Sequence, residues 1–455
     1  MPLETKNRLA LNGVDCLMLA FDRQLKKNGF AGNLAQIVLG LDTHMAAEEF
    51  QKRLAAVASG FPVIRATLKS RFWKGRPFWL IPVDGKRPFP EVRTHVLEAA
   101  PGSPRHEELR RRFLNTPLRT RRGEWIRFDL VYFSDRRMEI TMTWHHVLMD
   151  ARGAEYFLHL IGGGAEQKPL SMQEAADGSL IPFYKRLAAI DMKEKWRLAG
   201  RAFERIDGMA LLRPVSLYTR LKSRTRPRLD YRLESFSLPE TREIMVRCRE
   251  ICGPLNDSAY FLSAALLCLA DVHRKKNVPT RSYIVSFPVD LRKIGTRLPL
   301  FTNQAGTLLY EFKAGELTDI SSVAGLFRSQ TQEALRRDLL FANFCVQELS
   351  RFLPTWFYVR KIKKSLRGEI ASLVFANPGA TFQGLAEFLE QPVRYQYHVP
   401  AVVAPPGIGV VYYFFNDRLQ ITLVYAEGML TAGDAGDFLT GLRGRLLTGQ
   451  TPCGS

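Results

Sequence analysis

Trp144–Gly153, which reads WHHVLMDARG, is the stretch that decides the fold, because it places two adjacent histidines and an aspartate where a strand ends. The residues before it, 138–144, alternate apolar and polar side chains, as a half-buried strand does. Residues 154–161 then resume an apolar helical pattern. The histidines are therefore predicted to lie at a junction between a strand and a helix.

The two histidines are expected to have different roles, because neighbouring residues on a strand point to opposite faces. If the period of the strand continues, His146 falls on the apolar face with Met142 and Trp144. That face suits either a buried tunnel or a plain core, and the pattern does not choose between them. A neutral imidazole can take a proton from an attacking hydroxyl or amine, so a histidine in a cleft is a candidate general base.

Asp150 directly precedes the expected helix. Its carboxylate can cap that helix, orient a histidine or pair with a distant arginine. The spacing leaves all three roles open.

The pattern His-His-x-x-x-Asp, formed by His145, His146 and Asp150, resembles the signature of the chloramphenicol acetyltransferase-like superfamily. That superfamily includes nonribosomal peptide condensation domains, plant-type acyltransferases, wax ester synthase/diacylglycerol acyltransferases and polyketide-associated acyltransferases. One position departs from the pattern: the glycine that usually follows the aspartate is Ala151 here, and Gly153 comes two residues later.

Other segments resemble the superfamily in the expected order, so the resemblance covers most of the chain. Residues 61–67 contain a Pro-x-x-Arg segment, and residues 286–292 contain Pro-Val-Asp-Leu-Arg. Residues 303–306 and 376–379 resemble the Asn/Gly segments that follow. The histidine motif and the Asp-Leu-Arg strand are specific when taken together, whereas each of the other segments alone is more often an ordinary turn or strand end.

The resemblance implies an α/β fold of two subdomains arranged as a V, with the active site in a tunnel between them. It assigns His146 as the general base and His145 as a structural residue. It also implies that the motif aspartate, Asp150, forms a salt bridge with Arg292 and that Gly153 supports the same loop. Further residues are implied as possible channel residues, although Asn and Gly are also common in turns: Asn303, Gly306, Asn377 and Gly379.

Composition excludes several classes of protein. The 455 residues, 46% hydrophobic and 24% charged, are long enough for two domains with separate cores. There is no glycine-rich phosphate loop, Gly-x-Ser-x-Gly elbow or dinucleotide fingerprint, which disfavours a kinase, a serine hydrolase and a dehydrogenase. The longest mainly apolar run, residues 259–270, is too short to span a bilayer and is predicted to be a buried helix. We expect no secretory signal, and the six cysteines are scattered without a disulfide framework, which favours a reducing cytoplasm. Cys248 and Cys252 can share a helix face, but no second ligand pair stands nearby, so no metal is expected.

The chain divides into three parts by pattern. We expect an N-terminal subdomain over 1–180, a basic and mainly helical connector over 181–228, and a C-terminal subdomain over 229–455. The first part is predicted to contain strands 33–41, 126–133 and 138–144 and the helix 46–59. The last part is predicted to contain strands 231–237, 283–289 and 307–312, a helix opening at Pro239, a helix 259–273 capped by residues 256–258, a hairpin of 410–415 with 419–425, and a closing helix 435–447.

The formal net charge of +20 is unevenly distributed. Residues 184–228 carry thirteen Lys/Arg against four Asp/Glu, and a second basic cluster follows the apolar stretch 352–359. Such clusters suit an anionic membrane surface, an acidic carrier protein or a phosphorylated cofactor, whereas nucleic acid is not expected because no nucleic-acid module is visible. A merely solvated face remains an equal alternative. The second cluster consists of Arg360, Lys361, Lys363, Lys364 and Arg367.

The leading hypothesis is an acyltransferase that moves an acyl group from a coenzyme A or acyl-carrier-protein thioester to a hydroxyl or amine, with no bound cofactor. The enzyme would be cytoplasmic, with a possible peripheral position at the inner face of the membrane. The alternative is a binding or scaffold protein that keeps the fold and has lost the chemistry, for which Ala151 is a hint.

Overall fold

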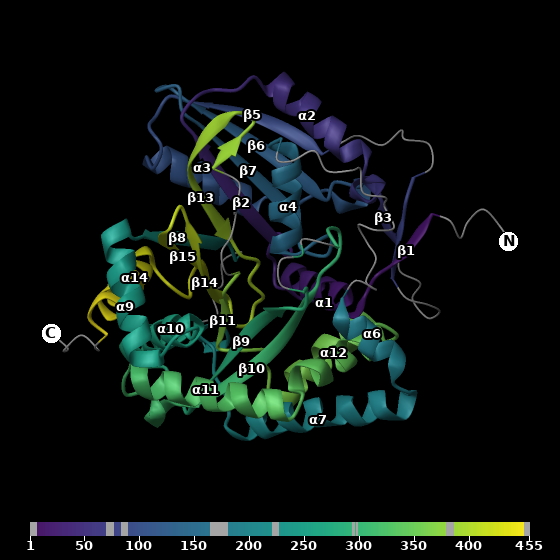
Figure 1. Cartoon of the computed structure of the whole chain (residues 1–455), viewed down its shortest axis with the longest axis vertical. Coiled ribbons are helices and arrows are strands. Elements are labelled where there is room, and N and C mark those ends of the chain that lie inside the picture. Colours follow the sequence, from purple (N-terminus) through teal and green to yellow (C-terminus); the bar gives the residue numbers. More distant parts are fainter. Residues whose placement is uncertain are drawn as a thin grey trace.

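The chain is arranged as two halves, each built on a six-stranded sheet (Figure 1). The structure is a computed structural model, which describes residues 7–69, 77–82, 90–163, 181–220, 227–293, 296, 299–378 and 386–449. A small third sheet, in the order β1-β4-β3, joins Arg8–Ala10, Phe78–Leu80 and Thr67–Lys69. The two-subdomain α/β architecture predicted from the sequence is confirmed.

The sheet of the first half has the order β12-β13-β2-β7-β6-β5. All of its pairs are antiparallel except β5 with β6. Its strands are β2 (Leu34–Leu41), β5 (Glu91–Leu97), β6 (Ile126–Phe133), β7 (Met138–His145), β12 (Glu387–Phe388) and β13 (Gln391–Val399). The helices of this half are α2 (Ala47–Ser59), α3 (Pro104–Asn115) and α4 (Ala151–Ile161), with short 3-10 turns at η2 (Pro62–Arg65) and η3 (Thr120–Arg122).

Strand β7 leads into the histidine motif. Its alternating pattern had predicted burial on one face, but both faces of the strand are buried. The polar face is covered because Glu139 accepts hydrogen bonds from three directions. Its carboxylate contacts His106 Nε2 at 3.1 Å, pairs with Arg110 of α3 and accepts from the Tyr395 hydroxyl of β13 at 2.8 Å. Burial by itself would raise the pKa of Glu139, but Arg110 and His106 lower it to about 2. An ionic cluster thus replaces water on this face.

The sheet of the second half has the order β10-β9-β11-β14-β15-β8, with β11 parallel to both of its neighbours. Its strands are β8 (Leu229–Ser235), β9 (Ser282–Asp290), β10 (Ala305–Lys313), β11 (Leu373–Ala376), β14 (Ile408–Phe415) and β15 (Arg418–Ala426). The helices that accompany it are α9 (Leu238–Cys252), α10 (Asp257–Lys275), α11 (Ile320–Arg336), α12 (Leu339–Ser350), α13 (Thr355–Ser365) and α14 (Ala432–Thr448), with a 3-10 turn at η5 (Ala314–Glu316).

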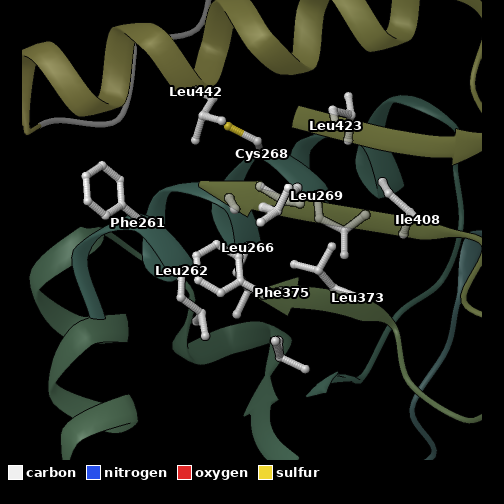
Figure 2. Packing of buried hydrophobic residues seen from close by; sticks show 14 of the residues in the cluster. Phe261, Leu262, Leu266, Cys268, Leu269, Leu373, Phe375, Ile408, Leu423 and Leu442 are labelled. Atoms are coloured by element: carbon white, nitrogen blue, oxygen red, sulfur yellow. The ribbon is translucent and has the colours of Figure 1, made fainter. Parts of the chain in front are cut away.

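Helix α10 forms the centre of the second core (Figure 2). The apolar run that it contains was predicted as a buried helix, and fourteen of its residues are buried. Its side chains pack between α14 and the strands of the second sheet, as the labelled residues show: Phe261, Leu262, Leu266, Cys268 and Leu269 of α10, Leu373 and Phe375 of β11, Ile408 of β14, Leu423 of β15 and Leu442 of α14.

Two local predictions in this half have different outcomes. The hairpin of β14 and β15 is confirmed, and Asn416 and Asp417 adopt the left-handed conformation that a tight two-residue turn requires. The expected side-chain cap of α10 is wrong. Asn256 stands at the cap position but donates to the Cys252 carbonyl at 3.0 Å.

Segments cross between the halves, which a division of the sequence into blocks did not anticipate. β12 and β13 come from the C-terminal part of the chain but pair with the first sheet, where β13 lies beside β2. Helix α1 (Gly13–Lys27) comes from the N-terminus but packs against α12 and α13. The predicted connector contains α6 (Pro182–Ala189), α7 (Met192–Leu211) and α8 (Leu217–Arg220), and its residues 221–226 lie outside the described part.

Among the described helices, none is by itself long and apolar enough to span a bilayer. Only α9 and α10 taken together pass that test of length and composition, and they are bent by 96° relative to each other.

Candidate active site

His146 lies where β7 ends and the chain turns towards α4. The strand stops at His145, and the His146 amide donates to the Asn33 carbonyl at 2.9 Å. Its side chain, together with that of Trp144, lines a cavity of about 420 Å³. Residues of both halves line this cavity. Of the two alternatives for the apolar face of β7, a buried tunnel or a plain core, the structure therefore has a cavity between the halves.

The amide of Asn303 determines which nitrogen of His146 carries the proton. Asn303 Nδ2 donates to Asp15 Oδ1 at 2.9 Å and to the His146 carbonyl at 2.8 Å, which leaves Oδ1 as the acceptor. This oxygen lies 2.9 Å from His146 Nδ1, so Nδ1 carries the hydrogen. The lone pair of the neutral ring is therefore on Nε2.

The surroundings of His146 favour the neutral imidazole. Burial lowers the pKa of His146 below its ordinary value, because desolvation penalises the cation. The hydrogen bonds at His146 and the charge of Asp150 act in the opposite direction but do not cancel this effect. The ring is consequently available as a proton acceptor at neutral pH.

Asp15 of α1 is the buried group that holds Asn303 in place. Its Oδ1 accepts from both the backbone amide and the side chain of Asn303 at 2.9 Å, and its Oδ2 accepts from Thr302 Oγ1 at 3.3 Å. Burial raises the pKa of Asp15 to about 7, although its hydrogen bonds with Asn303, Asn12 and Thr302 oppose this. Asp15, Asn303 and His146 thus form a chain of hydrogen bonds from α1 to the end of β7.

Asp150 fulfils two of the three roles that the sequence left open. It caps α4, because its Oδ1 accepts from the Gly153 amide at 2.9 Å. It also pairs with Arg292, whose Nη1 and Nη2 donate to its two oxygens at 2.9 and 3.1 Å. The backbone amide of Gln304 also donates to Asp150 Oδ2 at 2.8 Å. Burial alone would raise the pKa of Asp150, but Arg292 and these donors hold it below its ordinary value.

The pair of Asp150 and Arg292 therefore connects α4 of the first half to the end of β9 in the second. The Arg292 guanidinium is buried and also donates to the Pro299 carbonyl at 2.9 Å and to Asp290 Oδ1 at 3.2 Å. A planar guanidinium with several fixed acceptors has one preferred position. The ion pair implied by the resemblance is present in the structure.

Gly153 is required by a close approach of the two halves. A Cβ atom at this position would lie 2.3 Å from the Leu300 carbonyl oxygen and 3.1 Å from Met149 Cβ. Ala151, the departure from the usual pattern, is the first residue of α4 and lines the cavity. The alanine leaves both the cap and the ion pair of Asp150 in place.

His145 is buried on the other side of the motif. Its Nε2 lies 3.0 Å from Asp22 Oδ1 of α1, and its Nδ1 accepts from the Val147 amide at 3.3 Å. Burial would raise the pKa of Asp22, but His145 and Lys26 lower it. These contacts fix the turn after β7, which is consistent with a structural role.

The possible channel residues divide into three groups. Asn303 and Asn377 line the cavity, and Asn377 Nδ2 donates to Ser258 Oγ at 2.8 Å. The expectation that Gly306 lines the channel is wrong. A Cβ atom at Gly306 would point at Leu340 of α12, 2.6 Å away, whereas its neighbours in β10 face the cavity. Gly379 lies outside the described residues.

Sequence reasoning missed two residues of this site. His398 of β13, which belongs to none of the recognised motifs, lines the cavity, and its Nε2 lies 3.0 Å from Glu155 Oε1 of α4. Asp15 was not singled out either. Both arrive through segments that cross between the halves, so no local pattern in the sequence could have indicated them.

The rest of the cavity wall is mainly apolar, which suits an aliphatic chain. Its apolar side chains include Val14, Met18, Phe21, Ala35, Val374, Val399, Val403 and Val411. Within the described residues, no group of three or more His, Cys, Asp or Glu side chains could hold a metal ion. Cys248 and Cys252 are buried, and burial raises the pKa of their thiols to about 12 and about 11.

Comparison with known proteins gives structural matches only. No family model matches the chain, and no curated protein matches its sequence. The first condensation domain of the CDA synthetase is 15% identical, with a TM-score of 0.64 over 98% of this chain and 96% of that one. The trichothecene 15-O-acetyltransferase TRI3 from Fusarium sporotrichioides is 14% identical, with a TM-score of 0.66 over 97% and 96%.

A third match is the starter condensation domain of the rhizomide synthetase RzmA, in the form of a double mutant in complex with C8-CoA. It is 12% identical, with a TM-score of 0.65 over 97% of this chain and 94% of that one. These identities support a conclusion about fold. The chain has the fold of these condensation domains, in agreement with the fold that the resemblance of its His-His-x-x-x-Asp pattern had predicted.

Proposed function

We propose that this protein is an acyltransferase that moves an acyl group from a thioester to a hydroxyl or amine, with His146 as the general base. The observation that carries the proposal is the state of His146. Burial lowers its pKa and so favours the neutral imidazole, its Nδ1 donates to Asn303 Oδ1, and it lines an apolar cavity between the two halves. A base in that state can accept a proton from a bound nucleophile.

The reaction follows from this arrangement. As the acceptor attacks the thioester carbonyl, His146 Nε2 removes the proton from its hydroxyl or amine group. The tetrahedral intermediate then collapses and expels the thiolate, which takes the proton back from the imidazolium. Nδ1 keeps its hydrogen throughout, and Asn303 Oδ1 stabilises the cation that forms in between. Neither a covalent acyl-enzyme nor a metal is needed.

The donor in this proposal is an acyl-coenzyme A or an acyl carrier protein. Two observations support a thioester with an aliphatic chain: the apolar wall of the cavity, and the C8-CoA complex of the structurally similar RzmA domain. The protein is proposed to act in the cytoplasm.

The direct test is release of free thiol from acyl-coenzyme A in the presence of a panel of alcohols and amines. The native chain should release thiol and form the ester or amide of at least one acceptor, and His146→Ala should not. Equal rates for the two proteins would overturn the role of His146. A folded native chain that binds acyl-coenzyme A or the acceptor without any transfer would favour the alternative, a binding protein that has kept only the fold.

A further inference from the structure

The start of α13 exposes a group of large apolar side chains. Phe352 and Leu353, just before the helix, are 57% and 44% exposed, and Trp356 and Phe357 in its first turn are 51% and 41% exposed. These four side chains fall within six residues of sequence. Scattered exposed apolar residues are normal, but a group of this kind marks an interaction site.

The same face of α13 becomes basic towards its end. Arg360, Lys361 and Lys364 are exposed, and they follow Trp356 and Phe357 at helical spacing, so all five side chains share one face. The chain has no Asp or Glu between Glu348 and Glu369. We call these five residues, with Phe352 and Leu353, the α13 face.

A basic cavity adjoins the end of this helix. Its volume is about 850 Å³, and four cations line it: Arg213 and Arg220 from the connector, and Lys363 and Arg367 from the end of α13. Two carboxylates also line it: Glu427, and Glu369, which is buried and accepts a hydrogen bond from Ser216 Oγ at 2.7 Å. The balance of charge in this cavity favours an anion such as a phosphate.

We propose that the α13 face is a membrane-binding surface for anionic phospholipid. Trp356, Phe357 and their neighbours enter the interfacial region of the bilayer, as aromatic and apolar side chains do at that depth. The cations behind them contact lipid phosphates, and the adjoining basic cavity receives a headgroup phosphate. This surface is independent of the acyl transfer chemistry.

The position of α13 explains what a membrane contact would do. α13 packs against α1, and α1 also contributes Val14, Met18 and Phe21 to the wall of the His146 cavity. Two short segments of the chain contribute residues to both cavities. Glu369 and Pro405 line the basic cavity, while Ile370 and Val403 line the His146 cavity. A bilayer at the α13 face would therefore lie close to the His146 cavity. Apolar substrates are concentrated in a bilayer.

A membrane fits this face better than a protein partner does. A stable protein interface buries about 800 Å² per partner and mixes acceptors with donors along its rim. The α13 face instead offers apolar side chains and cations only, along a single helix. An acidic carrier protein would meet the cations but would have to cover the exposed aromatic rings as well.

The experiment is co-sedimentation of the full chain with vesicles of phosphatidylcholine alone or with about 30 mol% phosphatidylserine. The native chain should bind the anionic vesicles at low salt, and binding should weaken as salt rises and screens the charges. Arg360→Gln combined with Lys364→Gln should weaken binding roughly 25-fold, at about fivefold for each cation. Trp356→Ala with Phe357→Ala should weaken it about tenfold and should do so equally at high salt.

Matched controls separate this face from the general basic charge of the chain. Arg121→Gln with Arg122→Gln removes the same charge from exposed positions of η3, and Leu255→Ala with Leu335→Ala removes exposed apolar side chains elsewhere. Each control pair should change binding less than about twofold. Circular dichroism and thermal unfolding would establish that every variant is folded.

Two results would overturn the proposal. One is equal binding of native chain and both α13 variants to anionic vesicles. The other is no vesicle binding at low salt together with binding of a purified acyl carrier protein that the α13 substitutions abolish. Because vesicle binding needs no turnover, a chain that binds vesicles but transfers no acyl group would leave this proposal standing and remove the proposed function.

Discussion

Asn303 Oδ1 lies 2.9 Å from His146 Nδ1 and joins two segments that are 157 residues apart in the sequence. The contact is directional, because Asn303 Nδ2 is already used by Asp15 and by the His146 carbonyl. Asn303 therefore selects the tautomer with the lone pair on Nε2, and in the proposed mechanism it does not contact the reacting atoms itself. Asn303 is a positioning residue, and Asp15 positions Asn303 in turn.

Asn303→Leu should lower kcat by about 10- to 100-fold with the fold retained, because the ring loses the acceptor that fixes its tautomer. The pH profile provides a readout that a purely structural defect would not move. The hydrogen bond to Asn303 raises the pKa of His146, so its loss should move the acid limb of kcat to lower pH. An unchanged acid limb in the folded variant would show that Asn303 does not act on the ring.

The native enzyme should retain activity at mildly acidic pH. In the proposed mechanism the neutral form of His146 is the active one, and burial lowers the pKa of His146 below the ordinary imidazole value of 6.5. Activity is then full above that ordinary value and is lost as the pH falls through the lowered folded pKa. A kcat profile against pH should place the midpoint of the acid limb below 6.5; a midpoint above it would contradict the burial of the base.

The two histidines of the motif should respond differently to the same truncation. His146→Ala should lower acyl transfer by about two to four orders of magnitude with little change in unfolding temperature, as expected for the loss of a general base. His145→Ala removes one partner of buried Asp22, which keeps its ion pair with Lys26, and should act mainly on stability. Thermal unfolding measured beside kcat separates the two. A stable but equally inactive His145→Ala protein would mean that the roles have been divided wrongly.

Sequence reasoning succeeded where the signal is local. The period of residues 138–144 predicted β7. For Asp150, sequence reasoning left three roles open, and only the resemblance implied its pairing with the distant Arg292. Sequence reasoning failed where the chain crosses between the halves. β13 brings His398 beside β2, and α1 brings Asp15 to Asn303, and both pairings are non-local. Gly306 was wrongly assigned to the channel, because a shift of one residue along β10 moves a position to the opposite face of the sheet.

Gly153→Ala should destabilise the protein by about 1 to 3 kcal/mol or more, because the new Cβ would meet the Leu300 carbonyl oxygen at 2.3 Å. Backbone cannot rotate away as a side chain can, so either α4 or the segment at Leu300 must move. Movement there also disturbs Asp150, so activity should fall with stability. Ala151→Gly is the matched control, and it should cost at most about 1 kcal/mol of helix propensity. Chemical unfolding of both variants would measure the contrast.

Asp150 and Arg292 should show strong energetic coupling, although they belong to different halves of the molecule. Arg292→Ala leaves the Asp150 carboxylate buried without its cation and should cost about 3 to 5 kcal/mol of stability. Asp150→Ala should cost less, because the Arg292 guanidinium keeps its contact with Asp290 at 3.2 Å. The double variant removes both charges together. It should lose about 1 to 3 kcal/mol less than the sum of the two single losses, and this difference is the coupling energy that a double-mutant cycle by chemical unfolding would measure. Additive losses would mean that the hydrogen bonds at 2.9 and 3.1 Å contribute no mutual stabilisation and that the loop carrying His146 is held by its other contacts.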